Sequence, residues 1–316
     1  MSWAAMPPKS PSSSRGLLGL LGEIRDLGRS GDREPREFKA AARRNWSAVP
    51  CGTDVTLAAR HTREYFEEIE RYRYRTQPWT AQAIDRLEVQ GRRVLEVGFG
   101  AGTDHLRLAR RGARLAGVDL TPENFVETSR RFAHDGRRPA IAVADAESLP
   151  FRDGVFDLAY SFGVVHHTPD IDRALRELAR VIAPGGRAWI AVYHRRSIFF
   201  WWSVFAYRYL LKRGYRRRTL RAQLSLVEHP GTNEDLVVWL HTRRGMIARA
   251  ACAGFARVRT SVAHIVPADV AGLDVLVSEP ERPRAWLSWL GRAWGWYVVV
   301  EAEKDGAAQP ARQATK

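Results

Sequence analysis

The chain has 316 residues, of which 45% are hydrophobic, and a net charge of +15. This size is sufficient to bury one large core, or one core with an appended subdomain, which excludes an intrinsically disordered chain. Arginine dispersed along the sequence supplies nearly all of the positive charge, because only five of the 50 basic residues are lysine. Such dispersion does not predict a basic stripe for nucleic acid, so specific nucleic-acid binding is not expected.

Neither a membrane-spanning helix nor a disulfide framework is expected. The apolar run 198–207 is much shorter than the ~20 residues that a transmembrane helix needs. Cys51 and Cys252 lie far apart in the chain and show no metal-ligand spacing. We therefore expect a cytoplasmic protein without a metal site.

Composition and periodicity divide the chain into six expected parts. These are a disordered N-terminal segment (1–35), an N-terminal cap or lid (36–90), an α/β core (91–194), a helical insertion (195–254), the last two strands of the core (255–305) and a loose tail (306–316).

Within the lid, residues 61–79 predict a helix that is rich in aromatic side chains. Tyr72 and Tyr74 are candidates to contact a bound substrate from this helix. Packing of a cap helix onto the sheet explains the same aromatic residues equally well, so both interpretations stay open.

In the core, short β-branched or aromatic runs alternate with helical patterns. The runs include RRVLEV (92–97), ARLAGVDL (113–120) and FDLAYSF (156–162). This alternation is typical of βαβ units and predicts a parallel sheet that helices cover on both faces. Two more strand patterns, at 255–266 and 295–303, are expected to complete the sheet.

Three glycines follow the first predicted strand. Gly98, Gly100 and Gly102 stand between a strand and a helix, where a tight turn lets backbone N–H groups face a ligand. The dinucleotide fingerprint needs its third glycine at position 103, which is Thr103. Glu96, just before the turn, would repel a pyrophosphate but attract a cationic ligand. The turn therefore favours S-adenosylmethionine over NAD.

Two more carboxylates stand at the ends of the next two predicted strands. Asp119 ends the second strand, where it can accept hydrogen bonds from both ribose hydroxyls of either adenosine cofactor. Asp145 ends the third strand and can accept from the amino group of adenine, while the small Ala146 leaves room for the ring. A helix or turn cap is the alternative role for Asp145. Their position in series with Glu96 favours nucleoside binding.

Residues 92–194 resemble the class I S-adenosylmethionine-dependent methyltransferases, in the branch that includes quinone-biosynthesis and natural-product methyltransferases. The resemblance rests on VLEVGFGAGT, the two acidic positions, HHTPD and the PGG turn, which occur in this order. It implies a Rossmann-like seven-stranded sheet, mostly parallel with a reversed last strand, and S-adenosylmethionine as cofactor. The implied cofactor contacts are Glu96 at the methionine end, the three glycines along the back, Asp119 at the ribose, Asp145 and Ala146 at the adenine, and Leu120 and Phe162 as apolar walls.

Methyl transfer from a sulfonium needs a base only if the acceptor must lose a proton. His167, just after the fourth strand, lies where the methyl group is expected to emerge, and His194, after the fifth, is a second candidate base. Capping the next helix, or tying this loop to the sheet, is the alternative role for His167. Tyr193 is a candidate substrate contact or a core residue.

The segment 198–218 is apolar and then strongly basic. It predicts a buried helix, the wall of a hydrophobic substrate pocket, or peripheral contact with a membrane surface. The expected acceptor is a small hydrophobic molecule such as a quinone, a polyketide or a lipid.

Two other functions stay open at this point. One is an NAD(P)-dependent oxidoreductase, but Thr103 argues against it because the dinucleotide fingerprint needs a glycine at this position. An RNA-binding or RNA-methylating protein on the same fold is opposed by SFGVVHH (161–167), because this segment stands where a base-flipping motif would be expected. The oligomeric state is not predicted.

Overall fold

A computed structural model describes residues 34–48, 52–228 and 238–306, together with residues 19, 22–24 and 27. Most of the predicted loose ends, at 1–35 and 306–316, lie outside these residues. Leu27 is 1% exposed and belongs to the hydrophobic core. At this position, inside the segment expected to be disordered, the chain is packed.

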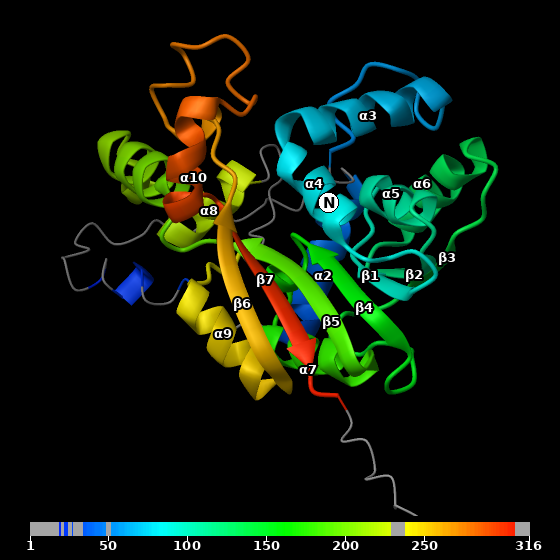
Figure 1. The fold of residues 1–316 in the computed structure, drawn as a ribbon. Helices are drawn as coiled ribbons and strands as arrows, with labels where there is room; N and C mark the ends of the chain where they lie inside the picture. The colour runs from blue at the N-terminus through cyan, green and yellow to red at the C-terminus, as the bar shows by residue number, and fades with distance from the viewer. Residues whose placement is uncertain are drawn as a thin grey trace, which may run out of the picture.

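A seven-stranded sheet forms the centre of the molecule (Figure 1), with the strand order β3-β2-β1-β4-β5-β7-β6. Strands β1 to β5 pair in parallel, whereas β7 runs antiparallel to both of its neighbours. The predicted Rossmann-like sheet with a reversed last strand is therefore confirmed. The strands are β1 (Arg93–Val97), β2 (Arg114–Asp119), β3 (Ala140–Val143), β4 (Phe156–Phe162), β5 (Ile182–Tyr193), β6 (Phe255–Ala263) and β7 (Tyr297–Lys304).

Helices cover both faces of this sheet. The α-helices are α2 (Pro35–Ala48), α3 (Arg63–Thr76), α4 (Pro78–Arg86), α5 (Thr103–Arg110), α6 (Pro122–His134), α7 (Ile171–Val181), α8 (Leu220–Glu228), α9 (Arg243–Cys252) and α10 (Ser288–Trp294). Short 3-10 turns are η1 (Val165–His167), η3 (Gly214–Arg216), η4 (Pro267–Asp269) and η5 (Ala285–Leu287), and η2 (Phe199–Leu211) is a π-helix.

Two hydrophobic layers explain why the central strands are apolar on both sides. On one face, Leu175 of α7 and Met246 of α9 are fully buried in a cluster with the strands. On the other face, Ile84 of α4, Leu108 of α5 and Phe200 of η2 are fully buried in a second cluster. Burial on both faces requires nearly continuous apolar runs, as the core strands show.

The described residues of the segment 195–254 include the helices η2, η3, α8 and α9. A second excursion, which the sequence did not indicate, joins β6 to β7. It runs over 264–296 and contains η4, η5 and α10. The strands β6 and β7 themselves lie where the two C-terminal patterns predicted them. None of the helices in the described parts of the chain is long and apolar enough to cross a membrane.

Candidate active site

One cavity of about 340 Å³ opens at the carboxyl ends of the parallel strands. Many of the residues predicted to bind cofactor or substrate line it. They are Glu96, Gly98, Gly100, Asp119, Leu120, Asp145, Ala146, Phe162, His167, Tyr72 and Tyr193.

The turn between β1 and α5 forms the back of this cavity. Gly100 has a φ of +51°, and a Cβ atom built at this position would have no neighbouring atom within 4 Å. Gly98 also lines the cavity, but its own constraint is packing, because a Cβ atom there would lie 2.1 Å from Val164 Cγ2. The backbone at Gly100 therefore leaves room that a ligand can fill.

Gly102 does not line the cavity, contrary to its predicted role in cofactor binding. A Cβ atom at this position would lie 2.6 Å from the hydroxyl of Thr128 on α6. Its φ of +76° also belongs to the left-handed region. Gly102 is therefore required for the start of α5 and for close helix packing.

Asp119, at the end of β2, holds the glycine turn in place. Its Oδ2 accepts a hydrogen bond from Gly100 N (2.9 Å), and its Oδ1 accepts from Thr121 N (2.9 Å) and Asn124 Nδ2 (3.0 Å). Burial raises the pKa of Asp119, and these hydrogen bonds oppose the rise. The Oδ1 of Asn124 is buried without a hydrogen-bond partner among the described residues. A hydrogen-bond acceptor is therefore available to a ligand at this edge of the cavity.

Glu96 is buried at the end of β1, where its Oε2 lies 2.7 Å from His105 Nδ1. Burial raises the pKa of Glu96 well above its ordinary value, and Asp104 adds to the rise. Burial lowers the pKa of His105 to about 3. The imidazole is therefore neutral near pH 7, and the contact is a hydrogen bond rather than an ion pair.

Asp145, after β3, is engaged by a lysine that the sequence analysis did not single out. Lys39 of α2 places its Nζ 2.5 Å from Asp145 Oδ2 and 2.6 Å from Glu147 Oε2. Burial would lower the pKa of Lys39, but the two carboxylates outweigh it and raise the pKa. With Phe38 and Trp46, Lys39 makes α2 one wall of the cavity. The only signal in the sequence was the scarcity of lysine itself.

Part of the cavity wall is aromatic. His167, on η1, lies with its ring centroid 5.7 Å from that of Trp46 and 5.8 Å from that of Tyr193. The rings of Phe162 and Tyr297 pack at a tilt of 34°, with their centroids 5.0 Å apart. These side chains form an apolar chamber beside the strand ends, with His167 as a titratable group in its wall.

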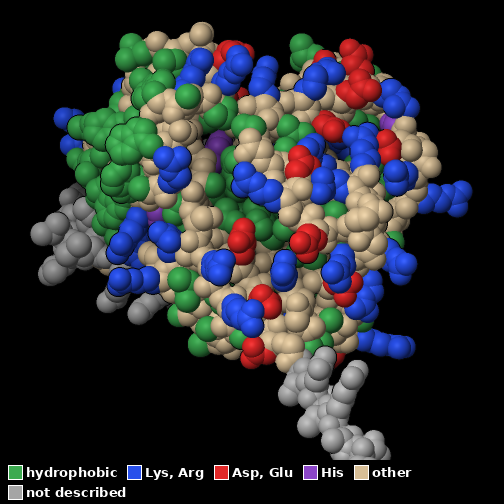
Figure 2. All heavy atoms as spheres, in the orientation of Figure 1, with side chains coloured by type: hydrophobic (Ala, Val, Ile, Leu, Met, Phe, Trp, Pro, Cys, Tyr) green, Lys and Arg blue, Asp and Glu red, His purple; other side chains and the backbone are tan. Residues whose placement is uncertain are grey.

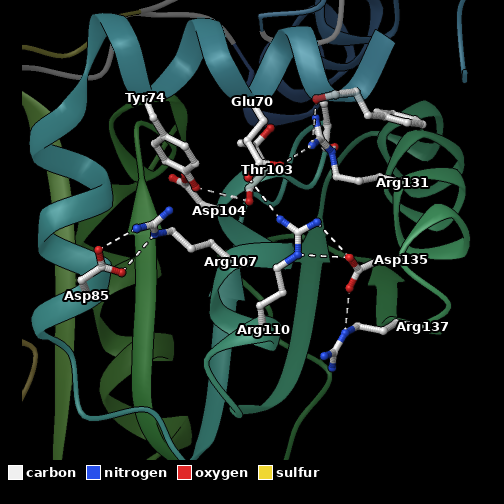
Figure 3. Close-up of polar contacts among 12 residues, drawn as sticks. Glu70, Tyr74, Asp85, Thr103, Asp104, Arg107, Arg110, Arg131, Asp135 and Arg137 are labelled. Carbon is white, nitrogen blue, oxygen red and sulfur yellow. Dashed lines mark hydrogen bonds and ion pairs between the residues drawn. The ribbon is translucent and has the colours of Figure 1, made fainter. Parts of the chain in front are cut away.

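The lid helix α3 divides its aromatic residues between the cavity and the core. Tyr72 lines the cavity and donates a hydrogen bond to Glu281. Tyr74 was predicted to contact substrate, but it does not line the cavity. It donates to Asp104 Oδ1 (3.1 Å), and Figure 3 shows this contact. Arg73, which the sequence analysis did not single out, lines the cavity instead.

Arg73, whose side chain is 20% exposed, forms an ion pair with the buried Asp104 that joins α3 to α5, with 2.7 Å between Arg73 Nη2 and Asp104 Oδ2. Burial would raise the pKa of Asp104, but Arg73 and hydrogen bonds from Tyr160 and Tyr74 hold it below its ordinary value. The guanidinium also lies 4.0 Å from the centroid of the Phe162 ring. This ion pair therefore fixes both the lid and one cavity wall.

A more exposed set of ion pairs extends the same joint (Figure 3). Glu70 of α3 and Asp135 after α6 both pair with Arg110 of α5, at 3.2 and 2.8 Å. Asp85 of α4 pairs with Arg107 of α5 at 2.6 Å. Such exposed pairs contribute little individually, so the buried Arg73–Asp104 pair is the main electrostatic link.

His194 does not belong to the cavity, contrary to its predicted role as a base. It is 2% exposed, its Nδ1 lies 3.0 Å from the carbonyl of Gly295, and its backbone N–H donates to Trp296. Burial lowers the pKa of His194. Its role is to tie the end of β5 to the start of β7. In the described parts of the chain, no group of three or more His, Cys, Asp or Glu side chains is arranged to hold a metal ion.

Comparison with known proteins adds independent observations. Residues 95–190 match a family model described as "Methyltransferase domain". The chain is 38% identical over 113 residues to a demethylmenaquinone methyltransferase of Thermus thermophilus, covering 34% of this chain and 51% of that protein. It is 39% identical over 117 residues to methyltransferase GfsG of Streptomyces halstedii, covering 35% and 42%.

The fold is also similar to solved structures. Magnesium protoporphyrin IX methyltransferase from Synechocystis, solved with bound S-adenosylhomocysteine, superposes with a TM-score of 0.51 at 14% identity. The match covers 85% of this chain and all of that one. By sequence, the chain spans about half or less of the length of the curated relatives described above.

Proposed function

We propose that the chain transfers a methyl group from S-adenosylmethionine to a small hydrophobic acceptor, because residues 95–190 match a methyltransferase domain and the chain is 38% identical over 113 residues to a demethylmenaquinone methyltransferase. The observation that carries this proposal is the convergence of Glu96, Asp119 and Asp145, from three successive strands, on one cavity. These carboxyl groups offer acceptor oxygens to the ammonium, ribose and adenine groups of a phosphate-free adenosine cofactor.

We infer that the cavity residues hold S-adenosylmethionine in the order that the family resemblance implies. We assign Glu96 to the methionine end, Gly98 and Gly100 to the back of the ligand, and Asp119 to the ribose. Open space at Gly100 and the unpartnered Asn124 Oδ1 support this assignment.

Asp145 and Ala146 are assigned to the adenine, with Leu120 and Phe162 as apolar walls. One oxygen of Asp145 accepts from Glu147 N (2.9 Å), and the other pairs with Lys39. Each carboxylate oxygen can accept two hydrogen bonds, so Asp145 retains capacity for the adenine amino group.

S-adenosylmethionine supplies an electrophilic methyl group on a sulfonium, so the protein must mainly align the acceptor and exclude water. The aromatic chamber of Trp46, Tyr193 and Tyr297 suits an apolar acceptor, and Tyr72 extends the same wall. His167 is the residue in this chamber that we assign to accept a proton from an acidic acceptor. Similarity to a demethylmenaquinone methyltransferase supports a quinone-like class of acceptor.

Contact of residues 198–218 with a membrane surface, from which a hydrophobic acceptor is delivered, belongs to the same proposal. It is supported by the exposed Trp201 and Trp202 on η2, which are 39% and 44% exposed.

Isothermal titration calorimetry with S-adenosylhomocysteine and with NAD tests the cofactor assignment. We expect binding of S-adenosylhomocysteine alone, and Asp119→Ala should weaken it by ~1 to 3 kcal/mol through lost charge-assisted hydrogen bonds. Asp135→Ala, on the exposed ion-pair network, is the matched control and should leave the affinity unchanged. Binding of NAD in preference would support the oxidoreductase alternative and overturn the proposal.

A further inference from the structure

Exposed tryptophans from two excursions of the chain gather on one side of the molecule. We call this area the tryptophan surface and define it by Trp201, Trp202, Leu211, Val275, Trp286 and Trp289, which come from η2, the η4–η5 connection and the η5–α10 region. Trp286 and Trp289 are 54% and 58% exposed, and Val275 is 80% exposed. Figure 2 shows hydrophobic side chains over a broad area at the upper left of the molecule, where Figure 1 places η2 and α10.

Specific contacts hold the segments of this surface together. Trp202 Nε1 donates to the carbonyl of Ala271 (2.9 Å), and the hydroxyl of Ser203 donates to the carbonyl of Asp269 (2.6 Å). The ring centroids of Phe199 and Trp296 lie 4.6 Å apart at the start of η2. These contacts fix the positions of the two segments, so the apolar side chains are held in place although they are exposed to water.

A basic border accompanies the tryptophan surface. Residues 198–221 contain seven Lys or Arg residues and no Asp or Glu. Lys212, Arg213 and Arg216–Arg218 are exposed, and none of them forms an ion pair with a described residue. In Figure 2, Lys and Arg side chains lie directly below the hydrophobic area. Several exposed tryptophans gathered beside cations that form no ion pair with a described residue are unusual for a surface that faces only water.

We propose that the tryptophan surface and its basic border dock on an anionic lipid bilayer. Tryptophan side chains favour the membrane–water interface, and clustered Arg and Lys residues attract anionic headgroups. A second copy of the chain fits less well, because a two-fold contact would place the same cationic border against itself. This docking extends the membrane contact of residues 198–218 proposed above to a surface that also includes Trp286 and Trp289, and it can be tested without measuring methyl transfer.

The position of this surface connects it to the acceptor side of the cavity. Glu281, in the same η4–η5 connection as Val275, accepts a hydrogen bond from Tyr72, which lines the cavity. If the proposed methyl transfer holds, a hydrophobic acceptor dissolved in the bilayer is brought to the lid side of the site. This last step rests on the proposed function.

Co-sedimentation of the full chain with lipid vesicles tests the docking. The vesicles contain phosphatidylcholine alone, or phosphatidylcholine and phosphatidylglycerol in equal parts. We expect binding to the anionic vesicles alone. Both Trp286→Ser/Trp289→Ser and Arg216→Glu/Arg217→Glu/Arg218→Glu should lower the partition coefficient at least tenfold.

Matched controls carry the same changes away from the surface. Leu57→Ser/Val126→Ser replaces two exposed apolar residues outside the tryptophan surface. Arg92→Glu/Arg138→Glu/Arg259→Glu reverses the charge at three exposed arginines outside the basic border. Both controls should keep vesicle binding to within about twofold, a bound set by the small cost of separated surface changes. Circular dichroism and thermal unfolding establish that each variant is folded.

Three results would overturn the docking. The first is that the wild-type chain does not bind anionic vesicles. The second is that the variants and the controls lose vesicle binding equally. The third is that sedimentation velocity shows a dimer which Trp286→Ser/Trp289→Ser dissociates. Calorimetry with S-adenosylhomocysteine separates this proposal from the proposed function. Cofactor binding without vesicle binding rejects only the docking, and vesicle binding without cofactor binding rejects only the methyltransferase assignment.

Discussion

The Nζ atom of Lys39 lies 2.5 Å from Asp145 Oδ2, so a helix near the N-terminus is joined by charge to the end of β3. The same nitrogen lies 2.6 Å from Glu147, whose other oxygen accepts a hydrogen bond from Asp170 N before α7. Lys39 thus links α2, the proposed adenine subsite and the start of α7.

Removal of this charge should loosen the wall that α2 provides. Lys39→Met should weaken binding of S-adenosylhomocysteine by ~1 kcal/mol, or about fivefold, because Asp145 and Glu147 lose a shared charged donor. Calorimetry measures the change. Lys39→Arg keeps the charge and should restore most of the affinity. Equal affinity in wild type and Lys39→Met would show that α2 has no part in holding the cofactor.

Glu96 should couple cofactor binding to proton release. Burial raises the pKa of Glu96, so its carboxyl holds a proton at pH values where an exposed glutamate is ionised. A cationic ligand stabilises the carboxylate and expels that proton, so the affinity for S-adenosylmethionine should rise as pH rises through the raised pKa. Titrations in two buffers with different ionisation enthalpies count the released protons. Glu96→Gln should abolish the difference between the buffers, and a proton count unaffected by this change would contradict the assignment.

The same carboxyl should affect stability with the opposite pH dependence. Because the pKa of Glu96 is higher in the folded state than in the unfolded state, its favourable contribution is complete below the unfolded value of about 4.3. This contribution is lost as pH rises through the folded pKa. Urea unfolding at several pH values should therefore show a flatter pH dependence for Glu96→Gln than for wild type. Parallel curves for the two proteins would refute this expectation.

Asp104 should be among the most sensitive positions for stability. Asp104→Ala leaves the guanidinium of Arg73 without its charge partner. Loss of one partner of a buried pair costs about 3 to 5 kcal/mol, and because the Arg73 side chain is 20% exposed we expect a loss of about 3 kcal/mol. The free energy of urea unfolding measures the loss. Asp85→Ala removes an exposed partner of Arg107 and should cost about 1 kcal/mol or less. Similar losses in the two variants would show that burial of the Arg73–Asp104 pair has no special weight.

His167 and His194 should separate function from stability. His167→Asn should lower turnover of an acceptor that must lose a proton by ~10²-fold or more, with unchanged affinity for S-adenosylhomocysteine. His194→Ala should instead lower the free energy of unfolding by ~1 to 3 kcal/mol, because it removes a partner of Gly295 inside the fold. Product formation and urea unfolding, measured for both variants, give the two readouts. A loss of turnover in His194→Ala without destabilisation would reverse the assignment.

The sheet and the glycine turn were predictable because their signals are local. A strand, a bend at Gly98 and a helix follow one another within a few residues, and carboxylates at strand ends converge whenever the strands are parallel. Tyr72 and Tyr74 differ because only tertiary contacts decide which side of α3 faces Asp104. Lys39 could not be placed, since no local pattern brings α2 to the end of β3.

The two histidines show the same limit. His167 and His194 both follow strands that end at the cavity edge, and the sequence offers no means to distinguish them. The distinction comes from β7, because its antiparallel pairing brings Gly295 to His194 and takes that ring into the interior.

The position of β7 between β5 and β6 has a consequence for biosynthesis. β5 cannot acquire its second neighbour, and β6 has no partner at all in the sheet, until the residues up to Lys304 have been translated and have left the ribosome. A nascent chain therefore exposes the unpaired edge of β5 while the two long excursions are still being synthesised, a state that invites intermolecular strand pairing. Completion of this half of the sheet therefore waits for β7, and until then the open edges of β5 and β6 are the surfaces most in need of protection.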